Sequence, residues 1–181
     1  ILQEEYSLLD AIVVGGLGIT LLNNADIVEI ACLAQLINVI APITTIRNGG
    51  IFKQAIYHPF HMLSKYGHGT AMKAVVDAPK YSCDFGELNI VEPAVVYNEE
   101  ADEVRIFVLN CDQEEDVELE IDLQGYGEKK VKKHLVLNGE DYEARNTIED
   151  PDRVTMKELE ASGTNRVILP KLSWNVVILR S

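Results

Sequence analysis

The sequence predicts an α+β fold, in which a helix–strand–helix segment is followed by an antiparallel β-sandwich. Up to Tyr66 the apolar residues recur at helical spacing or in unbroken runs, and beyond Thr70 they alternate with polar residues in short segments. The 181 residues, 47% of them apolar, are enough to bury a sizeable core. We expect two domains, residues 1–72 and 73–181, with the boundary near Lys73–Pro79.

The first predicted element is a helix over Ser7–Asn23. Ser7 can cap its N-terminus, and Asp10, three positions later, supplies a weaker form of the capping box. Almost nothing polar interrupts the run before Asn23, and a helix that is apolar nearly all round is buried. A glycine within a helix costs about 1 kcal/mol relative to alanine. We therefore expect another backbone to pack closely against the three that this helix contains: Gly15, Gly16 and Gly18.

The stretch Asp26–Ile43 is strongly apolar but carries two amides in its middle, Gln35 and Asn38. Burying an amide without partners costs roughly 1–3 kcal/mol, so each amide is either satisfied by the scaffold or directed at something polar. Periodicity alone fits Val28–Leu36 to a helix or to a buried strand. Its length, the turn residues before it and Pro42 after it favour a strand that is buried on both faces, as in a parallel sheet.

A loop over Ile43–Gly50 and a second helix over Phe52–Tyr66 follow this strand. The loop closes with an Asn-Gly-Gly run, which cannot sustain regular structure. Within the helix, Pro59 either introduces a kink or marks the true first turn. Gly67 ends the helix.

The second half of the chain predicts short antiparallel strands. The clearest runs from Val117 to Leu123 and alternates apolar with acidic residues, which is the pattern of a half-buried strand. Ala94–Tyr97 can pair with Val104–Leu109 through a polar turn. Short strands at regular spacing, without intervening helices, indicate a β-sandwich. Further strands are expected at Val131–Leu137, Arg166–Leu169 and Ser173–Leu179.

Charge and cysteine content restrict the class of protein. A net charge of −13 argues against nucleic acid or an anionic membrane as a partner. The apolar run Ala11–Leu22 is shorter than the roughly 20 residues that span a bilayer, and no signal-peptide pattern opens the chain. Three widely spaced cysteines predict reduced thiols, which favours a cytoplasmic protein: Cys32, Cys83 and Cys111.

Few residues indicate chemistry by themselves. Val13–Gly18 (VVGGLG) shares two features of a dinucleotide-binding loop, but it lacks the third glycine and lies inside a predicted helix, so close packing is favoured. His58 and His61 share a helical face and His68 follows. No acidic or thiol zinc ligand stands at a matching spacing, so capping or partly exposed histidines are favoured. The residues alone indicate no cofactor, no metal site and no self-sufficient active site.

Four long segments carry a specific pattern. They are Tyr6–Asp26 (YSLLDAIVVGGLGITLLNNAD), Ala31–Ile43 (ACLAQLINVIAPI), Ile51–Thr70 (IFKQAIYHPFHMLSKYGHGT) and Leu169–Leu179 (LPKLSWNVVIL). Together and in this order they resemble the C-terminal part of α-L-arabinofuranosidases of glycoside hydrolase family 51. The resemblance covers essentially the whole chain.

This resemblance implies a fold and one substrate-binding residue. The family joins a catalytic (β/α)8 barrel to a β-sandwich, so Ser7–Asn23 would be the seventh barrel helix, Val28–Leu36 the eighth strand and Ile51–Tyr66 the eighth helix. Barrel active sites lie at the C-terminal ends of the strands. Gln35 stands at such an end, and the family uses the matching glutamine to hydrogen-bond the arabinose. For Asn38 we expect a structural role in holding the loop backbone.

The resemblance also implies what this chain lacks. The two catalytic glutamates of the family lie on the fourth and seventh barrel strands, which would both precede Ile1. In the intact enzyme one glutamate would protonate the leaving oxygen, and the other would form a covalent arabinosyl intermediate with net retention. We therefore expect the C-terminal region of an enzyme that hydrolyses arabinose-containing oligosaccharides, with catalytic residues outside this chain and no activity of its own.

An alternative makes the β-sandwich a non-catalytic carbohydrate-binding or oligomerisation module. Only the acidic strand faces and the single Trp174 support this alternative. Sugar-binding modules usually display several exposed aromatic side chains, and this segment has few. Family members are often oligomers, so we expect a homo-oligomer. The sequence indicates neither the preferred linkage nor the natural polymer.

Overall fold

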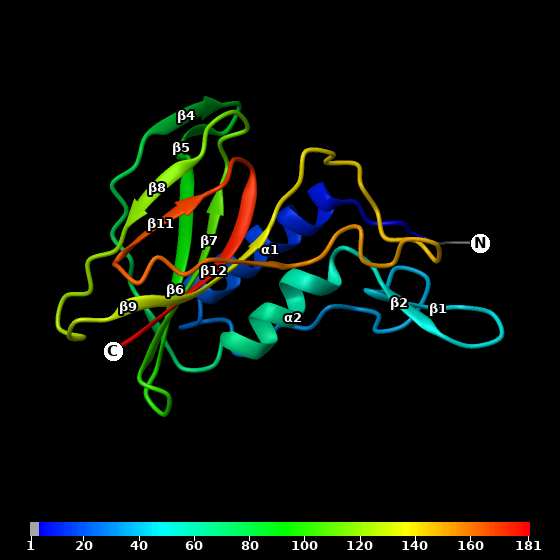
Figure 1. Cartoon of the computed structure of the whole chain (residues 1–181), viewed down its shortest axis with the longest axis horizontal. Helices are drawn as coiled ribbons and strands as arrows, with labels where there is room; N and C mark the ends of the chain where they lie inside the picture. Colours follow the sequence, from blue (N-terminus) through cyan, green and yellow to red (C-terminus); the bar gives the residue numbers. More distant parts are fainter. Residues whose placement is uncertain (1–3) are drawn as a thin grey trace.

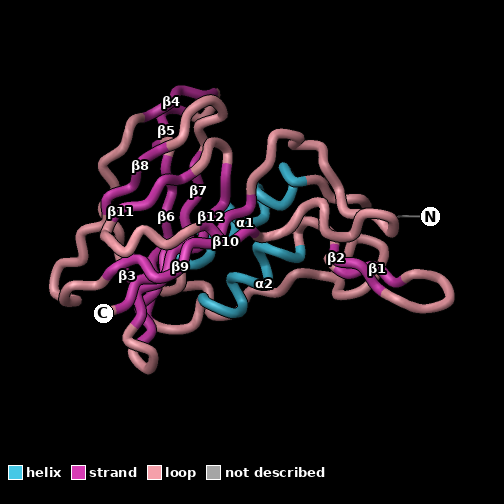
Figure 2. Tube along the Cα trace, in the orientation of Figure 1, coloured by secondary structure: helices cyan, strands magenta, loops and turns pink. Residues whose placement is uncertain are grey.

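The computed structural model describes residues 4–181, which form two α-helices and twelve β-strands (Figure 1, Figure 2). Strands therefore dominate the fold and helices are few. In chain order the elements are α1 (Leu8–Asn23), β1 (Ile43–Thr45), β2 (Ile51–Lys53), α2 (Tyr57–Tyr66), β3 (Thr70–Met72), β4 (Lys80–Cys83), β5 (Gly86–Asn89), β6 (Val91–Asn98), β7 (Glu103–Asn110), β8 (Val117–Glu120), β9 (Lys130–Leu137), β10 (Lys157–Leu159), β11 (Arg166–Leu169) and β12 (Ser173–Arg180).

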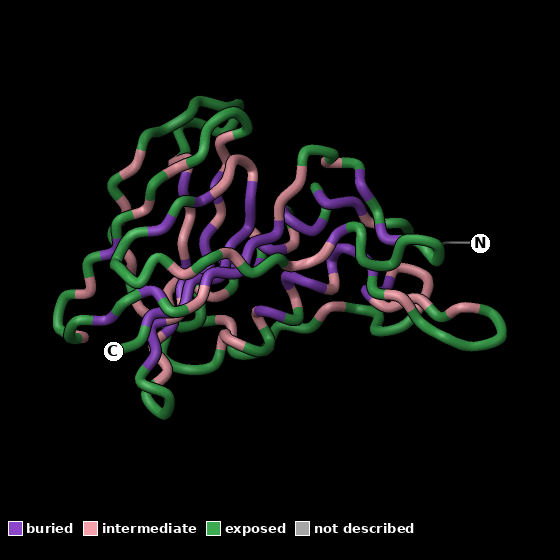
Figure 3. Tube along the Cα trace, in the orientation of Figure 1, coloured by how far each residue is buried: buried purple, intermediate pink, exposed green. Residues whose placement is uncertain are grey.

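Six strands form the main sheet, in the order β10-β9-β12-β7-β6-β3, and every neighbouring pair is antiparallel. The strand β12 pairs with β7 on one side and with β9 on the other. Its residues from Ser173 to Leu179 are all buried (Figure 3), because the sheet is covered on both faces. The predicted pairing of Ala94–Tyr97 with Val104–Leu109 is confirmed by β6 and β7.

Both helices pack on one face of this sheet (Figure 1). Leu8 and Ile12 of α1 and Met62 of α2 share a hydrophobic core with Phe107 and Trp174 from β7 and β12. The first strand after the helices, β3, adds to the edge of the same sheet beside β6. The division of the chain at residue 72 into two domains stays a prediction.

The opposite face of the main sheet is covered by the two-stranded sheet β8–β11. Successive side chains of a strand point to opposite faces, so Ile106 and Val177 face away from the helices and pack with Val167 and Leu169. A second hydrophobic core therefore lies between the two sheets. The hairpin β4–β5 pairs only with itself and is almost entirely exposed.

The start of α1 is capped as predicted. The Ser7 hydroxyl oxygen accepts the N–H of Asp10 at 3.3 Å, and the Asp10 carboxylate accepts the N–H of Ser7 at 2.8 Å. The expectation that a backbone packs against the helix glycines is wrong, because side chains fill this space. A Cβ on Gly15 would lie 2.5 Å from Cδ1 of Trp174, and a Cβ on Gly18 would overlap Leu63.

The prediction that the first helix is buried is confirmed for only one face of α1. One stripe of the helix is exposed by 40–59%, and it consists of Leu9, Val13, Leu17 and Leu21. Residues spaced by four lie above one another on a helix, so these side chains form a continuous apolar surface. Within residues 4–181, no helix or strand covers it.

The strand predicted over Val28–Leu36 does not form in this chain. The segment has no regular secondary structure, and most of its side chains are exposed, with Ile30 at 81%. A parallel strand takes its hydrogen bonds from neighbouring strands, and the described part of the chain supplies none beside this segment. The apolar pattern therefore predicted a buried strand, but the described part of the chain contains no strand with which this segment could pair.

The loop predicted over Ile43–Gly50 contains a strand and the turn of a hairpin. Ile43–Thr45 pairs antiparallel with Ile51–Lys53, and the Asn-Gly-Gly run between them has positive φ at all three residues. Glycine adopts this conformation without strain. The run therefore allows the chain to reverse and does not end the regular structure.

The second helix begins at Tyr57, five residues later than predicted, because Phe52 belongs to β2. Pro59 lies in the first turn of α2, where its missing N–H needs no partner. Gly67 ends the helix as predicted, and its N–H donates to the Leu63 carbonyl oxygen at 2.8 Å.

Candidate functional site

Gln35 lies in the irregular segment between α1 and β1, and its side chain is exposed. It stands three residues before a tight turn that begins at Asn38. This position leaves the amide accessible to a ligand. The sugar-binding role of Gln35 stays a prediction.

Asn38 organises the loop that follows Gln35. Its N–H donates to the Ile43 carbonyl oxygen at 2.8 Å. Its side-chain oxygen accepts the N–H of Thr45 at 2.8 Å and the Thr45 hydroxyl at 3.1 Å. The φ of 63° at Asn38 lies in the left-handed region, which asparagine tolerates better than most residues. The expected structural role of Asn38 is confirmed, because its side-chain oxygen holds the backbone and the hydroxyl of Thr45 in the loop.

A second amide, which the sequence did not single out, also holds this loop through hydrogen bonds on its buried side. Gln54 is buried, and its side-chain oxygen accepts the N–H of Tyr6 at 3.0 Å. Its side-chain nitrogen donates to the carbonyl oxygens of Glu4, at 3.0 Å, and Ala41, at 3.3 Å. The predicted helix over Phe52–Tyr66 concealed this role, because Gln54 lies in the turn before α2 and not on a helical face.

The segment before α1 completes the support of the loop. The N–H of Glu4 donates to the Val39 carbonyl oxygen at 2.9 Å, and the Tyr6 hydroxyl donates to the Ile40 carbonyl oxygen at 2.9 Å. Burial, with the nearby Glu4 carboxylate, raises the pKa of Tyr6 above its usual value. The phenol therefore keeps the proton with which it holds Ile40.

The histidines of the described residues do not form a metal-binding group. His58 is buried, contrary to the expectation of a capping or partly exposed side chain, whereas His61 is exposed and stacks on Tyr57. Within residues 4–181, no group of three or more His, Cys, Asp or Glu side chains could hold a metal ion. The three cysteines are free thiols.

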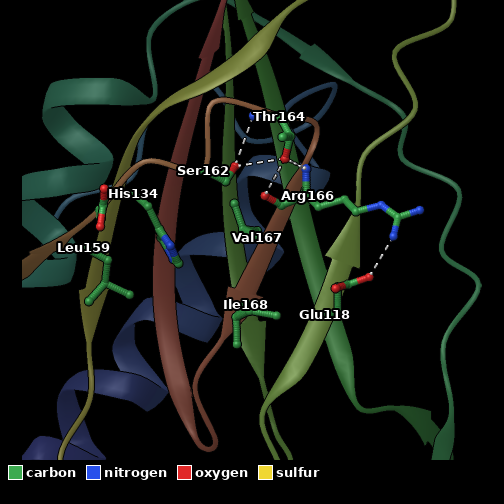
Figure 4. Close-up of a pocket in the computed structure, with 9 residues that line it drawn as sticks. Glu118, His134, Leu159, Ser162, Thr164, Arg166, Val167 and Ile168 are labelled. Carbon is green, nitrogen blue, oxygen red and sulfur yellow. Dashed lines mark hydrogen bonds and ion pairs between the residues drawn. The ribbon is translucent and has the colours of Figure 1, made fainter.

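A cleft of about 320 Å³ opens beside β8, β9 and β11 (Figure 4). Of its charged residues, Arg166 is paired with Glu118 at 3.2 Å and with Glu120, outside the lining, at 2.9 Å. His134 also lines the cleft, and its Nε2 lies 3.0 Å from the Asn175 side-chain oxygen. Burial lowers the pKa of this imidazole. The nine lining residues include no Phe, Tyr or Trp on which a sugar ring could stack. The cleft therefore gives no support to a carbohydrate-binding module.

None of the helices in the described part of the chain is long and apolar enough to cross a membrane.

Comparison with known proteins identifies the relatives of this chain. A family model described as the α-L-arabinofuranosidase C-terminal domain matches residues 1–173. An intracellular exo-α-(1→5)-L-arabinofuranosidase of Halalkalibacterium halodurans is 42% identical over 184 residues, covering 99% of this chain and 36% of the relative. The corresponding enzyme 1 of Bacillus subtilis is 40% identical over 185 residues, covering 99% and 37%.

Comparison of the fold with solved structures finds α-L-arabinofuranosidases as well. A family 51 α-L-arabinofuranosidase from Bifidobacterium longum is similar with a TM-score of 0.90 and 32% sequence identity, over 99% of this chain and 36% of that one. The chain thus spans little more than a third of the length of the proteins that it matches.

Proposed function

Because the chain belongs to the family of C-terminal domains of the family 51 α-L-arabinofuranosidases, we propose that it is part of a glycoside hydrolase. This enzyme releases terminal non-reducing α-L-arabinofuranosyl residues from arabinosides. The observation that carries the proposal is the family match over residues 1–173. The activity is proposed for a protein of the relatives' length, of which this chain would form the C-terminal region.

The uncovered stripe of α1 supports a finer proposal for the fold. Its four large apolar side chains, and Ile30 in the irregular segment, are exposed in this chain, and a contiguous exposed apolar patch often marks an interface. We assign residues 1–72 to a (β/α)8 barrel and residues 73–181 to a β-sandwich. The rest of the barrel would cover the stripe, and Val28–Leu36 would become a strand once its neighbours supply hydrogen bonds.

The proposed chemistry divides between this chain and the rest of the barrel. A retaining glycosidase needs two carboxyl groups about 5–5.5 Å apart, one as acid/base and one as nucleophile. We assign both to residues outside this chain, which would then be inactive alone. The chain would contribute Gln35, whose amide offers donors and an acceptor to sugar hydroxyl groups.

Substrate class and location follow from the names of the relatives. The enzymes of H. halodurans and B. subtilis are named as intracellular and as acting on α-(1→5) linkages. We extend the intracellular location and arabinose-containing oligosaccharides to this protein. The linkage stays open.

Hydrolysis of 4-nitrophenyl α-L-arabinofuranoside tests the proposed function. The protein encoded by the whole reading frame should cleave this substrate much faster than the matched β-D-xyloside, and residues 1–181 alone should cleave neither. An inactive whole protein would disprove the function. Activity of the 181-residue chain would disprove the assignment of the catalytic carboxylates.

Gln35→Ala tests the binding role within the active protein. We expect kcat/KM to fall by about tenfold to a hundredfold, because one hydrogen bond to the sugar in a water-excluded site contributes roughly 1–3 kcal/mol. For the 181-residue chain the midpoint of thermal unfolding should stay unchanged, since the Gln35 side chain is exposed there. An unchanged kcat/KM would contradict the role.

An oligomerisation role for the strand-rich part has one specific observation in its favour. Phe85 at the tip of the β4–β5 hairpin is 93% exposed, and Tyr81 and Leu88 on its strands are also exposed. An isolated two-stranded hairpin is marginally stable in water, so contact with a second copy would stabilise it. Light scattering should then show a homo-oligomer that Phe85→Ser weakens, and a monomeric wild-type protein would exclude this role.

A further inference from the structure

Gln54 lies where three segments of the chain meet: the residues before α1, the loop 38–45 and the turn before α2. We propose that Gln54 is a positioning residue that fixes the loop 38–45 and, through it, the orientation of Gln35 toward the sugar. This inference rests on the proposed function for its catalytic consequence. Its structural half, the support of the loop, is independent of that function.

The contacts of Gln54 form a clamp on the middle of the loop. The side-chain nitrogen donates to the Ala41 carbonyl oxygen, and the backbone N–H donates to the Pro42 carbonyl oxygen at 2.8 Å. The same side chain accepts the N–H of Tyr6 and donates to Glu4. Ala41 and Pro42 are buried, so these hydrogen bonds lie on the side of the loop that faces away from solvent.

The clamp reaches Gln35 through Asn38. The N–H of Ala41 donates to the Asn38 carbonyl oxygen at 2.9 Å, and Asn38 in turn holds Ile43 and Thr45. Asn38 also lies at the C-terminal end of the short segment that carries Gln35. A shift of Ala41 would therefore move Asn38 and change the direction of the Gln35 side chain. Displacement of a binding group by about 1 Å can lower the rate about a hundredfold.

Only an amide satisfies this position. The side chain must accept one hydrogen bond and donate two, and an amide does both without charge. Glutamate in the same place would still accept from Tyr6, but its second oxygen would face the carbonyl oxygens of Glu4 and Ala41. Methionine would fill a similar volume and make none of the three hydrogen bonds.

Asn146 provides a matched control elsewhere in the chain. It has the same 5% exposure as Gln54, and its amide also makes three hydrogen bonds to the backbone. It donates to the carbonyl oxygens of Lys53 at 2.9 Å and Val154 at 2.8 Å, and it accepts the N–H of Val154 at 2.6 Å. None of these partners belongs to the loop 38–45, although Lys53 pairs with Ile43 across β1 and β2. Asn146→Leu removes a buried amide of the same kind but leaves the hydrogen bonds from Gln54 to Ala41 and Pro42 in place, so it separates a general loss of stability from a loss of loop position.

Hydrogen exchange on the 181-residue chain tests the support of the loop directly. Gln54→Met should raise the exchange rates of the Asn38, Ala41 and Thr45 amides by about tenfold or more, whereas Asn146→Leu should raise exchange near Val154 and leave these three unchanged. Equal protection of the loop in Gln54→Met and the wild type would overturn the inference. If Gln54→Met does not fold, Gln54→Glu is compared in its place.

Kinetics of the whole protein test the catalytic consequence. With 4-nitrophenyl α-L-arabinofuranoside, Gln54→Met should lower kcat/KM by about tenfold to a hundredfold, and Asn146→Leu should leave it unchanged below the unfolding temperature. In a Gln35→Ala background Gln54→Met should cost less than about threefold more, since both changes remove the same contact.

The outcomes separate the inference from the function beneath it. If Gln35→Ala is impaired but Gln54→Met is as active as the wild type, or if the two losses multiply fully, the positioning role is overturned and the proposed function stands. An inactive wild-type protein overturns the proposed function together with the catalytic half of the inference, while hydrogen exchange still decides whether Gln54 holds the loop.

Discussion

The buried imidazole of His58 makes the stability of the fold depend on pH. Its side chain is 7% exposed, and its Nε2 has no hydrogen-bond partner within the described residues. Burial lowers the pKa of His58 to about 4; the positive charge of Lys53 acts in the same direction, as does His61, whereas Asp152 opposes them. The native protein therefore keeps this imidazole neutral at a pH where an unfolded chain would protonate it.

This difference predicts an acid-sensitive stability. Between the unfolded pKa of roughly 6.5 and the folded pKa of about 4, the unfolded state binds a proton that the native state does not. The free energy of unfolding should fall as the pH drops through this window, by roughly 3 kcal/mol from His58, and this contribution should level off below it. Urea unfolding from pH 7 to pH 4 should show a shallower decline for His58→Leu than for the wild type. Parallel curves would refute the role of His58.

The glycines of α1 give a second prediction at this scale. A Cβ on Gly15 would lie 2.5 Å from the buried Trp174 ring, which cannot move aside, whereas a Cβ on Gly16 would lie 3.3 Å from the end of the Leu109 side chain. Alanine gains about 1 kcal/mol of helix propensity at either position, but overpacking costs about 1–3 kcal/mol. Gly15→Ala should be less stable than the wild type and Gly16→Ala equally or more stable in denaturant titrations. The reverse order would show that Trp174 does not pack on Gly15.

At the scale of elements, a buried ion pair joins β7, β12 and α2. The Glu103 carboxylate is buried and contacts Arg105, at 2.7 Å, and Arg180. Arg105 also donates to the Tyr66 carbonyl oxygen at 3.3 Å and lies 5.7 Å from the Tyr66 ring centroid. The end of α2 is thereby held against the start of β7 in the main sheet.

Removing the Glu103 charge should weaken this junction. Arg105 is nearly buried, whereas the Arg180 side chain is 59% exposed. The loss of the carboxylate charge therefore leaves the Arg105 guanidinium uncompensated, which costs about 3–5 kcal/mol for a buried pair. Glu103→Gln should thus lower the free energy of unfolding by several times more than Glu158→Gln, which breaks an exposed pair with Lys133 at 3.2 Å and should cost less than about 1 kcal/mol. Similar losses in the two variants would mean that Glu103 contributes no more than a surface charge.

The elements also show what the sequence could predict. Strands with one face in the core were found because their apolar residues alternate, as in Arg166–Leu169, which was predicted without error. The strand Lys80–Cys83 was missed because all four side chains are exposed and no burial pattern marks it. Val28–Leu36 failed for the opposite reason, since its apolar pattern specifies neighbours that the described chain does not contain.

The candidate site was predictable to the same extent. The amides of Gln35 and Asn38 stood out because they interrupt an apolar run, and the loop-holding role of Asn38 is confirmed by its hydrogen bonds to Thr45. Gln54 did not stand out, because its three partners are backbone groups distant in the sequence. Such contacts leave no periodic pattern for the sequence to reveal.

At the scale of the whole molecule, the chain buries two cores but leaves the segment that carries Gln35 and one stripe of α1 uncovered. The loop 38–45 is nevertheless fixed by hydrogen bonds from within the chain. The proposed enzyme would therefore receive from this chain a stable sheet, a prearranged loop and one sugar-binding amide. The carboxylates that break the glycosidic bond would come from elsewhere.

A covalent label tests this division of the active site most directly. A mechanism-based arabinofuranosyl epoxide, which retaining enzymes open with their nucleophile, is incubated with the protein from the whole reading frame, and the labelled peptide is identified by mass spectrometry. We expect a single labelled glutamate outside residues 1–181, protected by free arabinose. A label on any carboxylate within residues 1–181 would contradict it.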